Sequence, residues 1–319
     1  MLAQKFLTSL AITATLFVGS YAYAQDSSLI WPQTEAAKPS EIKAFTPTLY
    51  KVTGKAHNST MYLFGSIHEL TEANSTIPKS VLESFDKADV AFFELPEDDL
   101  DADPAAMFGK LTPFMLLQGN DLITDYLSTD EIQQVAKLLP DMPDQAILKF
   151  RPWVLDMFLD LKDGNDAGMT ADYGVDLRLV KRGKTQGKTQ LGLEKLEEQI
   201  GFLSSDPIEV QAKRLKKNLS DRRTKPNEAA EQTAKLLQNW VDGDVDALEK
   251  DFAEYRKDDP EFYDRLNGQR NRAWMTKLTP YLGKSQTVFV TVGTMHLIGD
   301  DGLVKLMQKA GYKVERVKP

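Results

Sequence analysis

Short runs of apolar and β-branched residues lie near both ends of the chain and predict strands. Residues 49–52 and 61–64 form the first pair, joined by a polar turn. A helix is predicted from Pro78 to Ala88, and the apolar run Val90–Phe93 follows it. Strand, helix and strand in this order are typical of a right-handed parallel unit.

The C-terminal part of the chain returns to the same pattern. Residues 287–292 are almost all β-branched or aromatic and predict a buried strand. Residues 302–310 predict a helix that stops at Gly311, and residues 313–317 predict a last strand. Predicted strands therefore lie near both ends of the chain.

Amphipathic helical patterns dominate the region between these strands. Helices are predicted near residues 129–139, 152–162, 171–182, 195–202, 207–219, 226–241 and 260–278, with one short strand at 189–193. The pattern as a whole predicts an α/β fold with a mostly parallel sheet and flanking helices. We expect a long helical insertion, from about residue 97 to residue 280, that could act as a lid.

The N-terminus has the pattern of a cleavable signal peptide. A basic start precedes an apolar stretch from Phe6 to Val18, and an Ala-x-Ala site predicts cleavage after Ala24. The apolar stretch is too short to span a bilayer, which takes about 20 residues. Residues 25–48 are predicted to be a linker and residues 49–319 one α/β domain, so we expect a periplasmic or secreted protein.

Composition narrows the partners that this chain could bind. Lys and Arg number 39 against 47 Asp and Glu, which gives a formal net charge of -8 at pH 7. Nucleic acids and anionic membranes select basic patches, so we expect neither as a partner and no membrane insertion after signal cleavage. The chain has no cysteine, which excludes disulfides. Its oligomeric state stays open.

Two of the three histidines share a local setting. His68 and His296 each end a Gly-x-x-His sequence that directly follows an apolar run, whereas His57 lies in a polar turn and is expected to be structural. Gly65 and Gly293 are expected to let the chain leave the sheet abruptly. This places both imidazoles at the C-terminal ends of strands, where open parallel sheets bind ligands.

Glu94 follows the apolar run that ends at Phe93, so its carboxylate is expected at the same edge. A buried carboxylate needs a partner, a proton or a cation. It could pair with a neighbouring Arg or Lys. Alternatively it could join His68 and His296, because two imidazoles and a carboxylate are a common ligand set for a catalytic divalent metal. The chain has no His-Glu-x-x-His sequence, so it is not a zincin.

Taken together, these motifs resemble the TraB/GumN family, whose wider relatives include the Tiki metalloproteases and the erythromycin-esterase and ChaN-like proteins. The resemblance runs from about Leu49 to Val317. The segments that carry it are Tyr62–His68, Phe93–Leu95, Tyr173–Asp176, Leu193–Gln199, Gln269–Trp274 and Val292–Leu303. It implies that His68, Glu94 and His296 hold a divalent metal such as Mn, Co or Zn.

Four further positions match recurrent residues of that family, namely Asp176, Glu194, Arg270 and Asn271. Asp176 could cap its helix, pair with Arg178 or Arg270, or reach the site. Glu194 ends a short strand as Glu94 does, so it could be an additional or supporting acidic group. Arg270 could hold a substrate anion or a developing oxyanion, or it could pin the carboxylates in place.

The resemblance implies a metal-dependent hydrolase that acts on a peptide or a small-molecule substrate, with one carboxylate as general base. The alternative is a non-catalytic binding protein that uses the same crevice for haem or a peptide signal. An accessory role in envelope polysaccharide formation is suggested only by the GumN name. No residue pattern of the chain indicates a sugar site.

Overall fold

The computed structural model describes residues 46–54, 59–100 and 104–318. The signal peptide predicted at 1–24, most of the linker predicted at 25–48, and His57 lie outside these residues. In the part of the chain that is described, no helix is both long and apolar enough to cross a membrane.

Among the described residues, one sheet of six strands has the order β4-β3-β5-β2-β1-β6. The strands are β1 (Leu49–Thr53), β2 (Thr60–Ser66), β3 (Val90–Phe93), β4 (Thr189–Gly192), β5 (Thr287–Gly293) and β6 (Lys313–Arg316). Strands β2, β5, β3 and β4 run parallel, and β1 is antiparallel to both β2 and β6. This confirms the predicted α/β fold with a mostly parallel sheet.

Strand β5 lies between β2 and β3, although it comes from the C-terminal part of the chain. Every residue of β5 after its first is buried, as expected for a parallel strand covered on both faces. Its register pairs Gly293 with Ser66, the last residue of β2. The residues that follow the three strands therefore meet at one edge of the sheet, and they include His68, Glu94 and His296.

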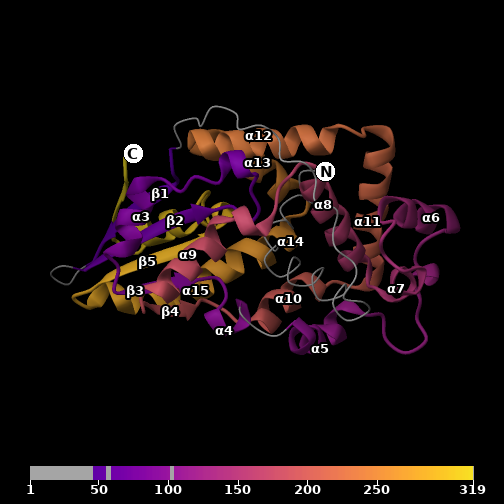
Figure 1. The fold of residues 1–319 in the computed structure, drawn as a ribbon, viewed down its shortest axis with the longest axis horizontal. Helices are drawn as coiled ribbons and strands as arrows, with labels where there is room; N and C mark the ends of the chain where they lie inside the picture. Colours follow the sequence, from indigo (N-terminus) through magenta and orange to yellow (C-terminus); the bar gives the residue numbers. More distant parts are fainter. Residues whose placement is uncertain (1–45, 55–58, 101–103, 319) are drawn as a thin grey trace.

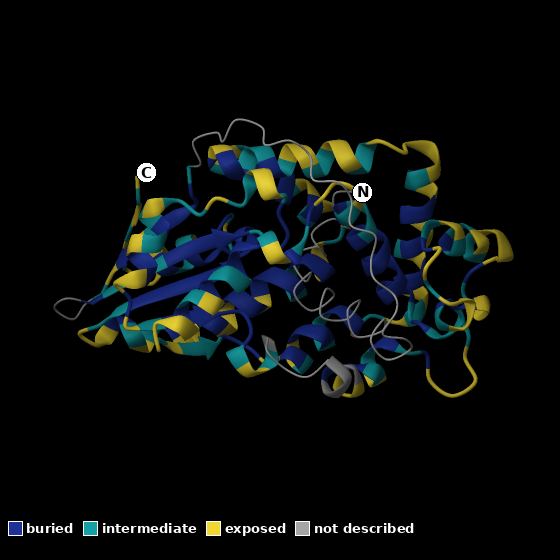
Figure 2. Ribbon diagram, in the orientation of Figure 1, coloured by how far each residue is buried: buried dark blue, intermediate teal, exposed yellow. Residues whose placement is uncertain are grey.

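Helices pack on the sheet and extend past its carboxyl edge. Figure 1 shows the sheet at one end of the molecule and α5, α6, α7, α8 and α11 toward the other, and Figure 2 shows the strands buried beneath helices with exposed outer sides. The helices before β4 are α3 (Lys79–Asp86), α4 (Glu97–Leu100), α5 (Pro104–Met115), α6 (Thr129–Leu138), α7 (Asp144–Lys149), α8 (Pro152–Asp166) and α9 (Val175–Thr185). Those after it are α10 (Leu196–Ser204), α11 (Ile208–Thr224), α12 (Glu228–Asp242), α13 (Val245–Asp258), α14 (Pro260–Tyr263), α15 (Arg270–Leu278) and α16 (Leu303–Lys309).

The helical region differs from the prediction in three ways. The pattern predicts none of α4, α5, α7 and α13, and α13 is separated from α12 by a short turn with Gly243 in the left-handed conformation (φ 64°). The single helix predicted at 260–278 contains a π-helical segment, Asp264–Gln269, between α14 and α15. Strand β4 also returns the chain to the sheet, so the predicted insertion consists of two helical segments, one before β4 and one after it.

The N-terminus of α9 packs directly against the loop that carries His68. A Cβ atom at Gly174 would lie 1.9 Å from the carbonyl oxygen of His68, so only glycine allows this approach. A 3-10 turn, Ala171–Tyr173, precedes Gly174, and α9 therefore begins later than the helix predicted at 171–182. The close contact places Asp176, in the first turn of α9, beside His68.

We expect Gly174→Ala to lower the free energy of unfolding by about 1 to 3 kcal/mol, because the added methyl group overlaps backbone that cannot move aside. Gly109→Ala is the matched control. Gly109 is exposed within α5, and a methyl group added there would meet no other atom within 4 Å, so alanine is expected to be neutral or stabilising by up to about 1 kcal/mol. Urea denaturation of the two variants measures this, and equal midpoints would contradict it.

A buried acidic cluster joins α8 to α11. Asp160 and Asp163 both pair with Arg222, at 3.0 and 2.7 Å. Asn218 donates to Asp156 at 2.7 Å. Burial and the neighbouring Asp156 carboxylate raise the pKa of Asp160 well above its usual value, and Arg222 opposes this only in part. The folded protein therefore holds the Asp160 proton to a higher pH than the unfolded chain does.

We expect Asp160→Asn to stabilise the fold, increasingly so as pH rises. Above the ordinary pKa of an aspartate the unfolded chain loses this proton while the folded chain keeps it, which removes stability from the wild type. Asparagine does not ionise, so its advantage over aspartate should grow from pH 4 to pH 7. Asp166→Asn, at a 65%-exposed side chain on the same helix, should show no such trend. Denaturant melts at both pH values measure the difference.

Candidate functional site

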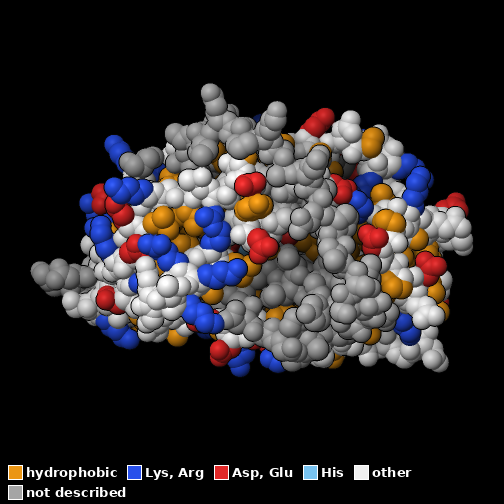
Figure 3. Space-filling view, viewed as in Figure 1, with side chains coloured by type: hydrophobic (Ala, Val, Ile, Leu, Met, Phe, Trp, Pro, Cys, Tyr) orange, Lys and Arg blue, Asp and Glu red, His pale blue; other side chains and the backbone are white. Residues whose placement is uncertain are grey.

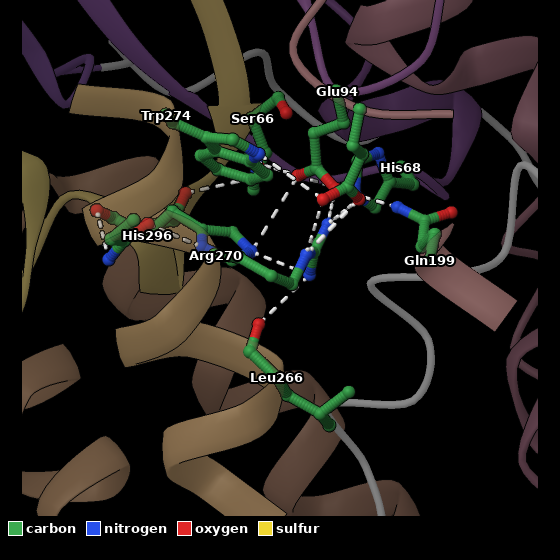
Figure 4. Close-up of polar contacts among 12 residues, drawn as sticks. Ser66, His68, Glu94, Gln199, Leu266, Arg270, Trp274 and His296 are labelled. Carbon is green, nitrogen blue, oxygen red and sulfur yellow. Dashed lines mark hydrogen bonds and ion pairs between the residues drawn. The ribbon is translucent and has the colours of Figure 1, made fainter. Parts of the chain in front are cut away.

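Arg270 lies at the centre of a buried polar cluster at the carboxyl edge of the sheet (Figure 4). Its Nη2 donates to Glu94 Oε2 and to Glu194 Oε1, each at 2.6 Å, and its Nε donates to both oxygens of Glu194 at 3.0 and 3.1 Å. Its Nη1 donates to the carbonyl oxygen of Leu266 at 2.9 Å and lies 3.0 Å from His296 Nε2. These contacts account for all five N–H groups of the guanidinium.

Other donors besides Arg270 also hold the two glutamates. Glu94, which follows β3, accepts from the backbone N–H of Gly293 at 2.8 Å and from Gln199 Nε2 at 3.1 Å. Glu194, which follows β4, accepts from the indole N–H of Trp274 at 3.2 Å. Burial raises the pKa of Glu194 above its usual value, although Arg270 acts in the opposite direction.

The guanidinium keeps its charge despite its surroundings. Burial lowers the pKa of Arg270, but Glu194 and Glu94 raise it more strongly, so the net shift is upward. Arg270 also lies over the ring of Trp274, 4.8 Å from the ring centroid. A permanent positive charge therefore lies between two carboxylates that come from neighbouring strands of the sheet.

His296 is a neutral imidazole whose tautomer follows from its neighbours. Arg270 can only donate, so His296 Nε2 must accept its hydrogen bond. Nδ1 then carries the proton and donates to Asn271 Oδ1 at 2.8 Å, while Asn271 Nδ2 donates to the carbonyl oxygens of His296 and Asp301. Burial, Arg270 and His68 lower the pKa of His296 well below its usual value, in agreement with the neutral form.

His68 has the opposite charge preference. Its Nδ1 lies 2.9 Å from Asp176 Oδ2, an ion-pair distance, although the N–H direction is too poorly aligned for a regular hydrogen bond. Ser66 Oγ donates to the other oxygen of Asp176 at 2.7 Å. Burial lowers the pKa of His68, but Asp176 and then Glu94 outweigh it and raise this pKa to about 9. His68 is therefore an imidazolium at neutral pH, and its buried Nε2 has no hydrogen-bond partner among the described residues.

The predicted metal ligands converge, but an arginine is part of the arrangement. Glu94 Oε1 lies 3.8 Å from His68 Nε2 and 3.9 Å from His296 Nε2, within the range of about 3 to 4 Å expected for atoms that share a metal with bonds near 2 Å. Arg270, however, occupies the lone pair of His296 Nε2. No group of three or more His, Asp or Glu side chains among the described residues is arranged to hold a metal ion. The two imidazoles and the carboxylate are ligand types that bind divalent metals. In the arrangement described, Glu94 and His296 bind the guanidinium of Arg270.

All the site residues predicted from the sequence belong to this cluster: His68, Glu94, Asp176, Glu194, Arg270, Asn271 and His296. Each of them is buried, and neither His68 nor His296 is visible on the molecular face in Figure 3. Glu94 pairs with an arginine, as one of its two alternatives states. Arg270 holds two carboxylates in place, as one of its own alternatives states. Asp176 pairs with His68, whereas Arg178 donates to the carbonyl oxygen of Ser75.

Sequence reasoning missed four contributors to the site, namely Ser66, Gln199, Leu266 and Trp274. Ser66 lies inside the first Gly-x-x-His sequence, and Gln199 and Trp274 lie inside segments that carry the family resemblance, so position gave a signal for three of them. Leu266 contributes only a backbone carbonyl, which no side-chain pattern indicates. Gly293 has an ordinary φ of -52°, and its contribution is the N–H that it donates to Glu94 rather than conformational freedom.

Comparison with known proteins finds a family model and two relatives that match most of this chain. The model of the TraB/PrgY/gumN family matches residues 48–316. The chain is 25% identical over 253 residues to "Uncharacterized protein YbaP" of Escherichia coli (strain K12), covering 79% of this chain and 89% of the relative. The protein of the same name from Shigella flexneri matches with the same identity and coverage.

We expect Arg270→Ala to lower the free energy of unfolding by about 3 to 5 kcal/mol, because it leaves two buried carboxylates without their counter-charge. Arg272→Ala is the matched control on the same helix. The exposed pair of Arg272 with Asp264, at 3.0 Å, should contribute about 1 kcal/mol or less. Urea denaturation of both variants measures the contrast, and similar losses in the two would show that the buried network does not hold the fold together.

Proposed function

The chain belongs to the TraB/PrgY/gumN family, and we propose that it is a divalent-metal-dependent hydrolase that cleaves amide bonds of peptides at the carboxyl edge of its sheet. The predicted signal peptide makes a periplasmic or secreted location part of this proposal. N-terminal sequencing of the mature protein tests that part, with Gln25 expected as the first residue.

One observation carries the proposal: the imidazoles of both Gly-x-x-His motifs flank the same oxygen of Glu94, at 3.8 and 3.9 Å. The three donors come from three different strand ends, and His68 Nε2 has no hydrogen-bond partner among the described residues although it is buried. A buried polar atom without a partner is costly, so the site favours a ligand at Nε2. A metal would take the place of the Nε2 proton of His68, because only the deprotonated nitrogen has a lone pair to donate.

His68, Glu94 and His296 would hold the metal, which when bound polarises a carbonyl group and lowers the pKa of water. The other residues prepare these donors. Asp176 fixes the Nδ1 side of His68, so that Nε2 faces Glu94. Asn271 Oδ1 accepts a hydrogen bond from the Nδ1–H of His296, so the lone pair of this imidazole is on Nε2, which also faces Glu94.

Glu194 and Arg270 supply the electrostatic setting of the proposed reaction. Arg270 places a positive charge beside Glu94, and a charge in this position can stabilise negative charge that develops on a substrate oxygen. Glu194 has a raised pKa, which suits a carboxylate that takes up a proton during hydrolysis. The predicted role of the helical region as a lid stays a prediction, but that region supplies Gln199 and Trp274 to the site.

Metal binding is the first test. The mature protein, freed of metal with a chelator, should bind Mn, Co or Zn with a stoichiometry near one, measured by calorimetry and elemental analysis. His68→Ala and His296→Ala should each weaken this binding by about 10-fold to 100-fold or more, as expected for the loss of a direct ligand. His57→Ala, the third histidine, is the matched control and should bind like the wild type. Full occupancy in both ligand variants would refute the proposed metal site.

Hydrolysis is the second test. Incubation of the metal-loaded protein with a mixture of synthetic peptides should give fragments that mass spectrometry detects, and Glu94→Gln should reduce the rate by about 100-fold or more. His57→Ala should retain activity. Cleavage that persists in Glu94→Gln would exclude this site as its source. A Soret shift on adding haem that disappears in His68→Ala, without any cleavage, would favour the binding-protein alternative.

A further inference from the structure

The guanidinium of Arg270 makes two of the contacts that the proposed metal would make. Its Nη2 is 2.6 Å from Glu94 Oε2, and its Nη1 is 3.0 Å from His296 Nε2, which carries the lone pair. A metal ion needs that same lone pair, and one nitrogen lone pair cannot serve two partners. Arg270 and a metal bound to His296 therefore exclude one another.

From this overlap we propose that Arg270 is an internal cation that competes with the divalent metal for His296 and Glu94, and so controls when the site is loaded. This inference rests on the proposed function, because it concerns the same three donors. In the arrangement described, Arg270 satisfies the buried acceptors in the absence of another cation. Metal uptake then requires the guanidinium to leave His296, while Glu194 keeps it close by.

The surroundings of Arg270 suit such an exchange. Glu194 receives contacts from both Nε and Nη2, at 2.6 to 3.1 Å, which would anchor the guanidinium after its Nη1 leaves His296. Arg270 is also the first residue of α15 and directly follows the π-helical segment Asp264–Gln269, whose Leu266 carbonyl accepts from Nη1 at 2.9 Å. π-Helical turns are rare and often lie at functional sites.

Competition of this kind predicts how the metal affinity changes when Arg270 is removed. The apparent dissociation constant rises by the factor by which the arginine-bound arrangement is favoured over the free one. Removing the guanidinium should therefore tighten metal binding even in a variant whose net charge at the site is unchanged. A purely structural arginine would leave the affinity of such a charge-balanced variant unchanged, or weaken it through loss of order. The direction of the change separates the two roles.

The experiment measures Mn, Co and Zn affinity by calorimetry for the full-length mature protein and for Arg270→Ala. We expect the variant to bind at least about 10-fold more tightly than the wild type. Arg272→Ala, which removes an exposed arginine two positions along the same helix, should leave the affinity unchanged. The double variant Arg270→Ala with His296→Ala should lose the gain, because the gain depends on the freed lone pair.

Arg270→Ala leaves two buried carboxylates unbalanced, so a second variant guards against its failure to fold. Glu194→Gln combined with Arg270→Met removes one negative and one positive charge together and retains all three proposed metal donors. Metal-induced change in Trp274 fluorescence gives an independent readout, since Arg270 lies over this ring and the ring is 4.5 Å from that of His296. Trp274→Phe should lose that signal.

The outcomes separate the inference from the proposed function. Tighter metal binding on removal of Arg270, lost again with His296→Ala, supports the competition. Equal or weaker affinity in both variants that lack Arg270, relative to the wild type, overturns the competition and leaves the metal-dependent hydrolase standing. No binding of any of the three metals, even without Arg270, overturns the metal site itself and the competition with it.

Discussion

The fold is organised around one buried positive charge. A guanidinium that is 3% exposed must have a partner for each of its N–H groups, and Arg270 finds them on the residue after β3, on the second residue after β4, in the turn after β5 and in the π-helical segment before its own helix. The helices that follow β4 are therefore tied back to the carboxyl edge of the sheet. Four segments of the chain are fixed relative to one another by a single side chain.

The two Gly-x-x-His motifs differ in chemistry because the neighbours of their histidines differ. His68 faces Asp176 and Glu94, and these carboxylates favour its protonated form. His296 faces Arg270 and a neutral amide, and its protonated form is disfavoured. Two histidines with the same local sequence thus differ in charge at neutral pH because their partners come from distant parts of the chain. A motif fixes where such a side chain lies, and its tertiary partners fix its state.

Local pattern could predict that His68, Glu94 and His296 follow buried strands, because apolar runs mark strands and all three residues come just after such runs. It could not predict that β5 inserts between β2 and β3, since strand order depends on contacts between residues more than 200 positions apart, such as Thr60 with Thr287. The contacts of Arg270 depend on that strand order, because they come from residues that follow different strands. From the sequence alone, Arg270 could bind substrate or hold carboxylates in place, and only the tertiary structure shows which residues it contacts.

The π-helical segment shows why part of the site cannot be predicted from the spacing of apolar residues in the sequence. Apolar spacing at three and four residues predicts a continuous helix across 260–278, and that prediction is correct for most of its length. Arg270 directly follows the wider turn at Asp264–Gln269, and Leu266 within that turn supplies a carbonyl to its guanidinium. A π turn is less stable than an α turn, so it persists where other contacts offset its cost. Here the hydrogen bonds of one buried guanidinium supply that compensation, and the π turn and the site depend on one another.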